Sequence, residues 1–185
     1  TYLEVNGTYE IDEAFGGGNG ADDITINGVT MANPGANVGY VAYPAEDDID
    51  GSNERDKAYR QEKYGYGTGV ATTMIKGGKI HNVYGGSNKK GNIRSTALSL
   101  LESMNDDCPM QVAQSYGGGK DAKMDADIDT RMQCAQGVKE VFGGSMNADV
   151  NSDITLTITN GSSLERVFGG NNTSGAIAGS ITIYI

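Results

Sequence analysis

The sequence predicts an all-β protein, a right-handed parallel β-helix with about 26 residues per coil and one lateral insertion. Two observations favour this fold. A motif of one aromatic residue and two glycines occurs five times along the 185 residues, and a short stretch of alternating apolar and polar residues lies downstream of each copy. A unit this short cannot bury its own apolar face, so we expect successive units to stack.

The repeated motif sets the spacing of the coils. Successive aromatic positions differ by 69, 32, 26 and 26, and the last two intervals define the period. Equivalent positions of neighbouring coils should therefore lie about 4.8 Å apart and form ladders. We expect Phe142 to lie beside Phe168, and Val138 beside Leu164. The full set of repeated aromatic residues is Phe15, Tyr84, Tyr116, Phe142 and Phe168.

Each copy of the repeat offers two strand segments. The first ends at the aromatic residue and carries an aliphatic residue four positions earlier, namely Ile11, Ile80, Val112, Val138 or Leu164. The second lies downstream, at residues 24–26, 97–100, 126–128, 154–158 and 181–185. Because the last segment alternates up to the final residue, we expect residues 1–185 to be one domain within a longer array, with further β-helix coils stacked on it.

The long first interval indicates an insertion at residues 31–69. This interval is either one coil with an excess of 43 or two coils with an excess of 17. The stretch is rich in Gly, Pro, Asp and Tyr, and residues 54–63 could form one short helix. Lateral loops of a rigid scaffold commonly carry the binding residues, and tyrosine rings stack on sugars or protein surfaces. The sequence therefore predicts a ligand-binding loop with Tyr40, Tyr43, Tyr64 and Tyr66.

Composition and charge exclude several classes of function. The formal net charge is -10 and the pI is near 4.4, which argues against nucleic acid or an anionic membrane surface as a partner. No apolar run is long enough to indicate a membrane span. The 28 glycines are about twice the usual share, so a folded state depends on the periodic placement of few apolar residues.

Three copies of the motif carry a resemblance to a known family. They are Val83-Tyr84-Gly85-Gly86-Ser87-Asn88, Val141-Phe142-Gly143-Gly144-Ser145 and Val167-Phe168-Gly169-Gly170-Asn171-Asn172. They resemble the V-[FY]-G-G-[GSN]-N repeats of large, mostly uncharacterised surface or secreted proteins of Bacteroidetes, over most of residues 75–185. The resemblance implies parallel β-helix architecture and an extracellular or cell-surface location, and it assigns no functional residue.

The two cysteines occupy equivalent positions in neighbouring repeats. Cys108 and Cys134 are one period apart, and each lies eight positions before its aromatic residue. Stacked Cα atoms about 4.8 Å apart fall within the disulfide range, but side chains on in-register parallel strands point the same way and would strain the bond. The spacing thus fits either two stacked free thiols or a disulfide.

A group of four oxygen-bearing side chains is the strongest candidate for chemistry. The period places Asp125 beside Asn151 and Asp127 beside Asp153. Such a group could hold calcium, the one cofactor that the sequence indicates, or form a solvated acidic surface. The acidic stretch at residues 46–51 resembles a calcium loop, but its twelfth position is Lys57 where a glutamate is needed.

The remaining candidates do not assemble into a recognisable catalytic centre. His81 is the only histidine, and we interpret it as a solvent-facing turn residue. Arg131 and Lys123 are the basic residues nearest the acidic group in the sequence. We therefore expect a non-catalytic, adhesin-like surface scaffold that contacts glycans or proteins through its insertion. Two alternatives stay open: a polysaccharide lyase or hydrolase using the stacked carboxylates, and a calcium-stiffened adhesin.

Overall fold

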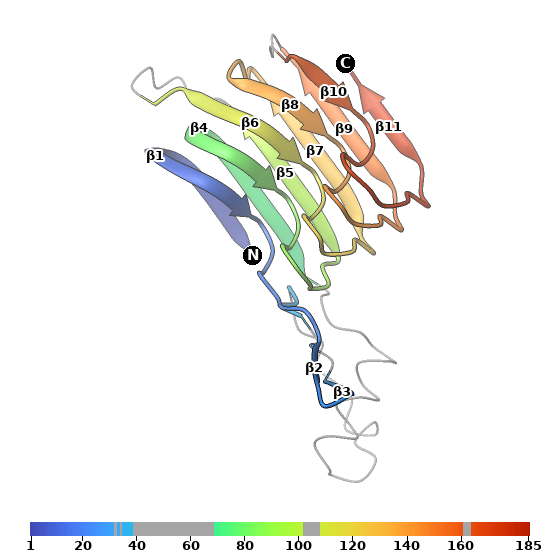
Figure 1. The fold of residues 1–185 in the computed structure, drawn as a ribbon. Helices are drawn as coiled ribbons and strands as arrows, with labels where there is room; N and C mark the ends of the chain where they lie inside the picture. Colours follow the sequence, from blue (N-terminus) through green and yellow to red (C-terminus); the bar gives the residue numbers. More distant parts are fainter. Residues whose placement is uncertain (32, 34, 39–68, 102–107, 161–163) are drawn as a thin grey trace, which may run out of the picture.

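The computed structural model describes residues 1–31, 33, 35–38, 69–101, 108–160 and 164–185 (Figure 1). Every regular element in these ranges is a β-strand, and no helix that could cross a bilayer occurs in them. The strands are β1 (Tyr2–Phe15), β2 (Ile24–Ile26), β3 (Val29–Met31), β4 (Val70–Tyr84), β5 (Ser95–Leu101), β6 (Met110–Tyr116), β7 (Asp127–Gln133), β8 (Val138–Phe142), β9 (Ile154–Thr159), β10 (Arg166–Phe168) and β11 (Ile181–Tyr184).

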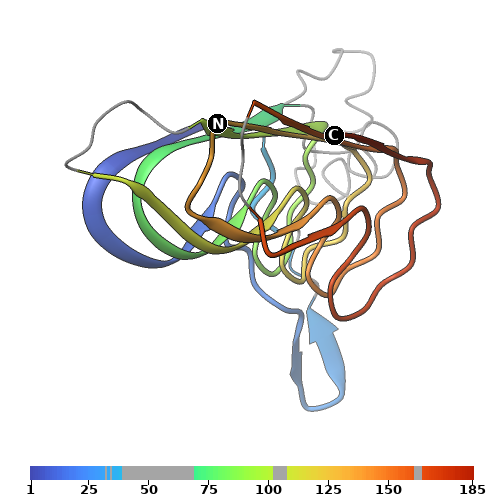
Figure 2. The ribbon, with the colours of Figure 1, turned by 90° about the horizontal axis from the view of Figure 1, so that it is seen from above.

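One curled, parallel sheet contains all the strands except β2 and β3 (Figures 1 and 2). Its order is β10-β8-β6-β4-β5-β7-β9-β11, and β1 pairs with β4. The long strands β1 and β4 each run through both halves of the curl, whereas later repeats divide the same path between two strands. The predicted all-β, parallel architecture is confirmed at this level.

We name the two halves of the sheet for the description below. The first arm consists of residues 2–5 of β1, residues 70–75 of β4, and β5, β7, β9 and β11. The second arm consists of residues 10–15 of β1, residues 78–84 of β4, and β6, β8 and β10. Pairing within each arm is parallel and joins successive repeats.

The pairing register follows the predicted spacing on the second arm. Phe168 pairs with Phe142, and the amide of Glu165 donates to the carbonyl of Lys139 at 2.8 Å, which continues this register toward Leu164 and Val138.

The structure also accounts for the two irregular intervals. Phe15 pairs directly with Tyr84, so the long first interval is one step of the sheet rather than two. The excess in the interval from Tyr84 to Tyr116 falls between β5 and β6, because β4 pairs with β5 at an offset of 25 and with β6 at an offset of 32.

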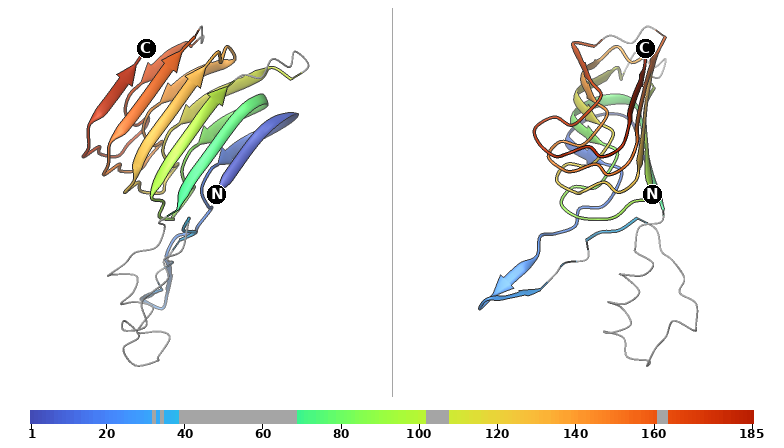
Figure 3. Two further views of the ribbon diagram at one scale, coloured as in Figure 1. Left: turned by 180° about the vertical axis from the view of Figure 1, so that it is seen from behind. Right: turned by 90° about the vertical axis from the view of Figure 1, so that its right-hand side faces the viewer.

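The assignment of residues 24–26 to the repeat is wrong. They form β2, which pairs antiparallel with β3 in a separate hairpin that projects from the sheet (Figure 3). Asn27 and Gly28 have φ angles of 52° and 79°, as a two-residue hairpin turn requires. The Asn-Gly pair therefore turns the chain back on itself, and the strand that follows the first glycine motif in the sheet is the start of β4, after the insertion.

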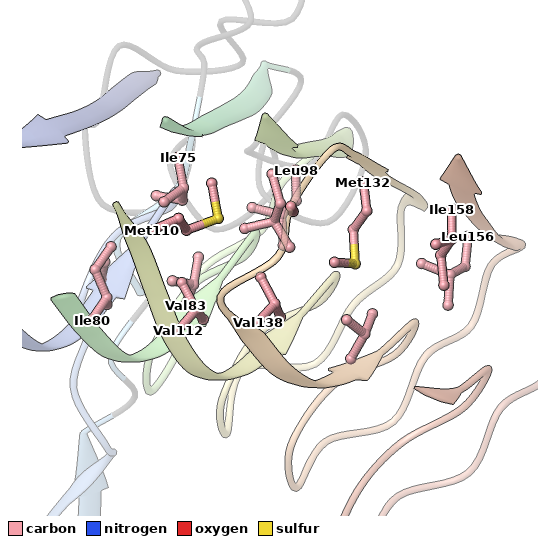
Figure 4. Packing of buried hydrophobic residues seen from close by; sticks show 14 residues of the cluster. Ile75, Ile80, Val83, Leu98, Met110, Val112, Met132, Val138, Leu156 and Ile158 are labelled. Atoms are coloured by element: carbon pink, nitrogen blue, oxygen red, sulfur yellow. The ribbon is translucent and has the colours of Figure 1, made fainter. Parts of the chain in front are cut away.

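The main apolar core lies between the two arms (Figure 4). Inward side chains of the first arm, such as Leu98 and Leu156, meet inward side chains of the second arm, such as Val112 and Val138. All four are at most 2% exposed. Each repeat contributes only a few aliphatic residues, but stacking joins them into one continuous core, which explains how a glycine-rich chain buries enough apolar surface.

The repeated aromatic residues form a second apolar layer on the opposite face of the second arm. Successive residues of a strand point to opposite faces, so Val83 enters the main core and Tyr84 does not. Successive rings stack from Phe15 to Phe168 with centroid distances of 4.6, 4.9, 4.9 and 4.8 Å. The glycines permit this close stacking: a Cβ on Gly117 would lie 2.4 Å from the carbonyl oxygen of Gly143.

Candidate functional site

A groove of about 640 Å³ lies on the first arm and contains the best candidate site. Its walls come from four strands that the sheet places side by side. Apart from Thr96, which is buried on the inward face, the polar residues that line the groove alternate with core residues along their strands and share the outer face of the sheet. The lining residues with polar side chains are Ser95, Thr96, Asp127, Asp129, Arg131, Asp153, Thr155, Thr157 and Tyr184.

The register arranges these side chains in rows across the sheet. Arg131 pairs with Thr157, and Thr157 pairs with Tyr184, so a guanidinium, a hydroxyl and a phenol ring succeed one another. Asp129 pairs with Thr155 in the adjacent row. A row of charged, hydroxyl and aromatic groups can hydrogen-bond and stack with a polar ligand such as a sugar chain.

Asp129 and Asp153, two of the carboxylates that line the groove, make local contacts. An Asp129 carboxylate oxygen lies 2.8 Å from Arg131 Nη2, and this hydrogen-bonded pairing raises the pKa of Arg131. Asp153 Oδ1 accepts a hydrogen bond of 2.8 Å from the amide of Ser180. The Asp153 contact joins two successive repeats, whereas the pair of Asp129 and Arg131 lies within β7 and neutralises charge there.

The four predicted oxygen-bearing residues form two pairs in the structure. Asp127 and Asp153 line the groove of the first arm. Asp125 and Asn151 lie in the turn before it, where Asn151 Nδ2 donates to Asp125 Oδ1 at 2.8 Å and Lys123 Nζ lies 3.2 Å from the same oxygen. The predicted stacking of Asp125 on Asn151 is thus present. Within the described ranges, no three His, Cys, Asp or Glu residues are grouped as metal ligands.

The predicted ligand-binding tyrosines, Tyr40, Tyr43, Tyr64 and Tyr66, lie outside the described residues, as do the acidic stretch 46–51 and the expected short helix 54–63. The described end of the insertion packs on the sheet. The amide of Val38 donates to the carbonyl of Asn92, and Val38 is buried with Ala71 and Ile93.

The cysteines are free thiols in the structure. Cys108 is partly buried just before β6, and Cys134 is exposed just after β7. Cys134 adopts a left-handed backbone conformation with a φ of 55°, as Asn160 does one repeat later with a φ of 54°. Of the two states that the sequence left open, the structure contains the reduced one.

His81 is exposed, as expected, but it lies within β4 and not in a turn. It lines a second groove of about 640 Å³ on the second arm, together with Lys79 and Lys139. Lys79 Nζ pairs with Glu10 Oε1 at 2.9 Å there. The turn assignment was wrong because the bend of the sheet interrupts the alternation, leaving Ile80 and Val83 three positions apart and both in the core.

A polar cluster beside the aromatic rings was not predicted. Lys120 Nζ pairs with Glu13 Oε1 at 2.8 Å, although the two residues are far apart in the sequence, and the Tyr84 hydroxyl lies 3.3 Å from the same oxygen. Burial and the nearby Glu13 carboxylate raise the pKa of Tyr84 well above its ordinary value. The ion pair between Lys120 and Glu13 connects the turn after β6 to β1.

The sequence signals for these missed residues were weak. Tyr184 could have been placed on the groove by extending the alternation of the last strand, which puts it on the same face as Thr182. The contact between Glu13 and Lys120 depends on the path of a turn, for which no spacing rule exists.

Comparisons of the chain with protein-family models, curated proteins and solved structures find no match.

Proposed function

We propose that this chain is a non-catalytic segment of a right-handed parallel β-helix that serves as a rigid scaffold outside the cell or on its surface. The repeat of about 26 residues in the sequence corresponds to one coil. One observation carries the proposal: the aromatic ladder runs through five strands with centroid distances of 4.6 to 4.9 Å. A chain that repeats one contact along its length is suited to holding other groups at fixed positions.

The location is proposed from the sequence. The repeats resemble those of surface and secreted Bacteroidetes proteins, and the acidic composition suits a solvent-exposed scaffold. As an adhesin-like segment, the chain would bind glycans or proteins through residues 31–69 and stack on further coils of a longer parent protein.

The way the insertion joins the scaffold supports its role in display. The amide of Gly69 donates to the carbonyl of Val38 at 2.9 Å, so the chain departs from and returns to one point of the sheet. Residues 39–68 can therefore be replaced by a short glycine-serine linker while Val38 and its core contacts remain. This deletion separates the binding role from the folding role.

The decisive experiment compares wild type, the 39–68 deletion and a full-length variant with Tyr40, Tyr43, Tyr64 and Tyr66 changed to serine. Each is applied to a printed glycan array and checked by circular dichroism and thermal unfolding. We expect all three to fold and only wild type to bind. Binding that survives in the deletion variant would contradict the role of the insertion. If the deletion variant still binds and the added change Tyr184→Ala removes that binding, the binding site lies in the groove of the first arm.

A second candidate function, polysaccharide lyase or hydrolase, is favoured by the presence of Asp127, Asp153 and Arg131 in one groove. An assay for new reducing ends or unsaturated products from acidic polysaccharides tests it. The scaffold proposal predicts no turnover. Turnover that disappears in Asp127→Ala or Asp153→Ala, with the fold retained, would establish the enzyme instead.

The calcium-stiffened adhesin is the third candidate, and the pair of Asp125 and Asn151 in one turn is the observation behind it. Oxygen ligands of this kind suit calcium. Thermal unfolding in calcium and in chelator distinguishes the cases. A rise in Tm with calcium that is absent in Asp125→Asn would support it. Equal Tm values in both solutions would exclude it.

A further inference from the structure

The groove of about 640 Å³ on the second arm, which contains His81, has no part in the scaffold function. Its central part is formed by β4, β6 and β8. Each of these strands is paired on both sides: β4 with β1 and β6, β6 with β4 and β8, and β8 with β6 and β10. The centre of the groove therefore lies within the sheet and not at one of its edges.

The register arranges the side chains of this groove in two rows across the sheet. In one row, Lys79 pairs with Glu10. In the other row, the pairing places His81 opposite Ala113, and Ala113 opposite Lys139. Neighbouring strands are about 4.8 Å apart, so a single methyl group lies midway between an imidazole and an ammonium group. The groove is thus hollowed at Ala113, with a nitrogen-bearing side chain on each side of the hollow.

Positive charge lies in the middle of the groove and negative charge at its two ends. Lys139 is exposed and, among the residues that the structure describes, forms no ion pair. Lys79 pairs with Glu10, but the two side chains are 57% and 74% exposed, so both can contact a ligand. Glu165 lines the opposite end of the groove from Glu10. The order of charges along the groove is therefore negative, positive, positive, negative.

This order of charges matches one sequence pattern of an extended peptide. Glu10 and Glu165 are each two strands away from Ala113, which is about 10 Å. Alternate side chains of an extended peptide lie on one face, about 6.6 Å apart, and a long lysine side chain spans the remaining distance. An acidic residue over the hollow would lie between the basic groups of the groove. Lysines two positions before and after it would reach the two glutamates.

We propose that this groove binds an extended segment of a partner protein with the pattern Lys-x-Glu-x-Lys, in which x is uncharged. The net charge of -10 repels acidic segments in general, and the two lysines of the pattern offset that repulsion. One exposed ion pair contributes little, so discrimination comes from the order of several charges. This docking goes beyond the scaffold function, because it uses the sheet itself and does not depend on residues 31–69 or on glycan binding.

Two synthetic peptides of equal composition test the order of charges: Thr-Lys-Thr-Glu-Thr-Lys-Thr and Thr-Lys-Thr-Lys-Thr-Glu-Thr. His81 is the only histidine, so the NMR signals of its imidazole ring report on the groove of the whole chain. At one fixed pH, the first peptide should shift these signals until they saturate, and the second should bind at least about fivefold more weakly. Equal binding of both, or no shift with either, would overturn the proposal.

A charge reversal within the groove tests the site. Lys139→Glu should weaken binding of the first peptide at least about fivefold and should bind a peptide with lysine in place of the central glutamate more tightly than wild type does. Lys123→Glu, an equal change outside the groove, should bind the first peptide as wild type does.

Lys139→Gln replaces the first variant if circular dichroism shows that Lys139→Glu is unfolded, and it should weaken binding less. The same weakening in Lys123→Glu as in Lys139→Glu would show that net charge and not the groove is responsible. The deletion of residues 39–68 should bind the first peptide as wild type does. Failure of peptide binding would leave the scaffold proposal intact, because that proposal is tested with glycans and with the insertion.

Discussion

The rings of Phe15 and Tyr84 stack at a centroid distance of 4.6 Å and an interplanar angle of 5°, although the whole insertion lies between them in the chain. The next two rings, of Tyr116 and Phe142, follow at shorter and unequal sequence intervals, yet their centroid distances are nearly the same. Ladder geometry is therefore independent of the length of chain between its members. The length differences are absorbed outside the sheet.

Placing a charge in the main core should unfold the protein. Val138→Asp would bury a carboxylate without a partner at a site that is 2% exposed, so we expect a loss of roughly 3 kcal/mol or more. Leu164→Asp should cost less, because Leu164 lies at the end of the ladder and is only partly buried. Urea denaturation measures both, with the exposed Lys139→Ser as control. Equal losses at 138 and 164 would contradict a core that is deepest in the middle of the stack.

Truncation within the aromatic ladder should depend on position. Tyr116 is fully buried between two rings, and Tyr116→Ala should lower the free energy of unfolding by about 3–5 kcal/mol. Phe168 contacts one ring and is 42% exposed, so Phe168→Ala should cost about 1 kcal/mol. Chemical denaturation of both variants and wild type at one protein concentration provides the comparison. A larger effect at 168 than at 116 would contradict the ladder.

Alkaline pH should destabilise the protein through Tyr84. The pKa of its phenol is raised in the folded state, by burial and by Glu13, from an ordinary value of 10.0. The folded state thus holds the proton more tightly than the unfolded chain, and this stabilisation is complete below the ordinary pKa and is lost as the pH rises above it toward the raised pKa. Urea denaturation at about pH 8 and about pH 11 should show a smaller decrease for Tyr84→Phe than for wild type. The exposed change Tyr184→Phe is the control, and an identical decrease in all three would refute the assignment.

The backbone at Cys134 predicts an unusual pair of substitutions. Its φ of 55° lies in the left-handed region, which glycine adopts freely and branched side chains avoid. Cys134→Gly should therefore leave stability unchanged or raise it by up to about 1 kcal/mol, and Cys134→Val should lower it by about 1–2 kcal/mol. Thermal unfolding in reductant measures both. Cys134→Gly that is less stable than Cys134→Val would show that the thiol makes a contact of its own.

The sequence predicted the second arm more fully than the first. The motif around Phe142 and Phe168 has constant spacing, and the parallel pairing follows from it. The sequence did not decide whether Phe15 pairs directly with Tyr84, because an interval of 69 residues fits either one coil or two coils with an insertion. Residues 24–26 were assigned to the repeat wrongly, because an alternating pattern of three residues is equally typical of a hairpin strand and of a strand in a parallel sheet.

The candidate site was predicted only in part. Asp127 and Asp153 follow from the period, because each lies at or just before the start of a first-arm strand. Tyr184 and the pairing of Arg131 with Asp129 were missed. The rotamers of exposed side chains depend on neighbours across the sheet, and periodicity does not encode them.

The hydrogen bond between Val38 and Gly69 has a consequence for engineering and for divergence. Because this hydrogen bond holds the two ends of the segment together, the segment can be exchanged without changing the pairing register of the strands in the sheet. Doubling the length of a flexible loop costs only about 0.6 kcal/mol of closure entropy. Foreign peptides, or whole domains whose termini lie close together, could be grafted between Val38 and Gly69. Homologous chains could change this segment freely while their repeats stay recognisable.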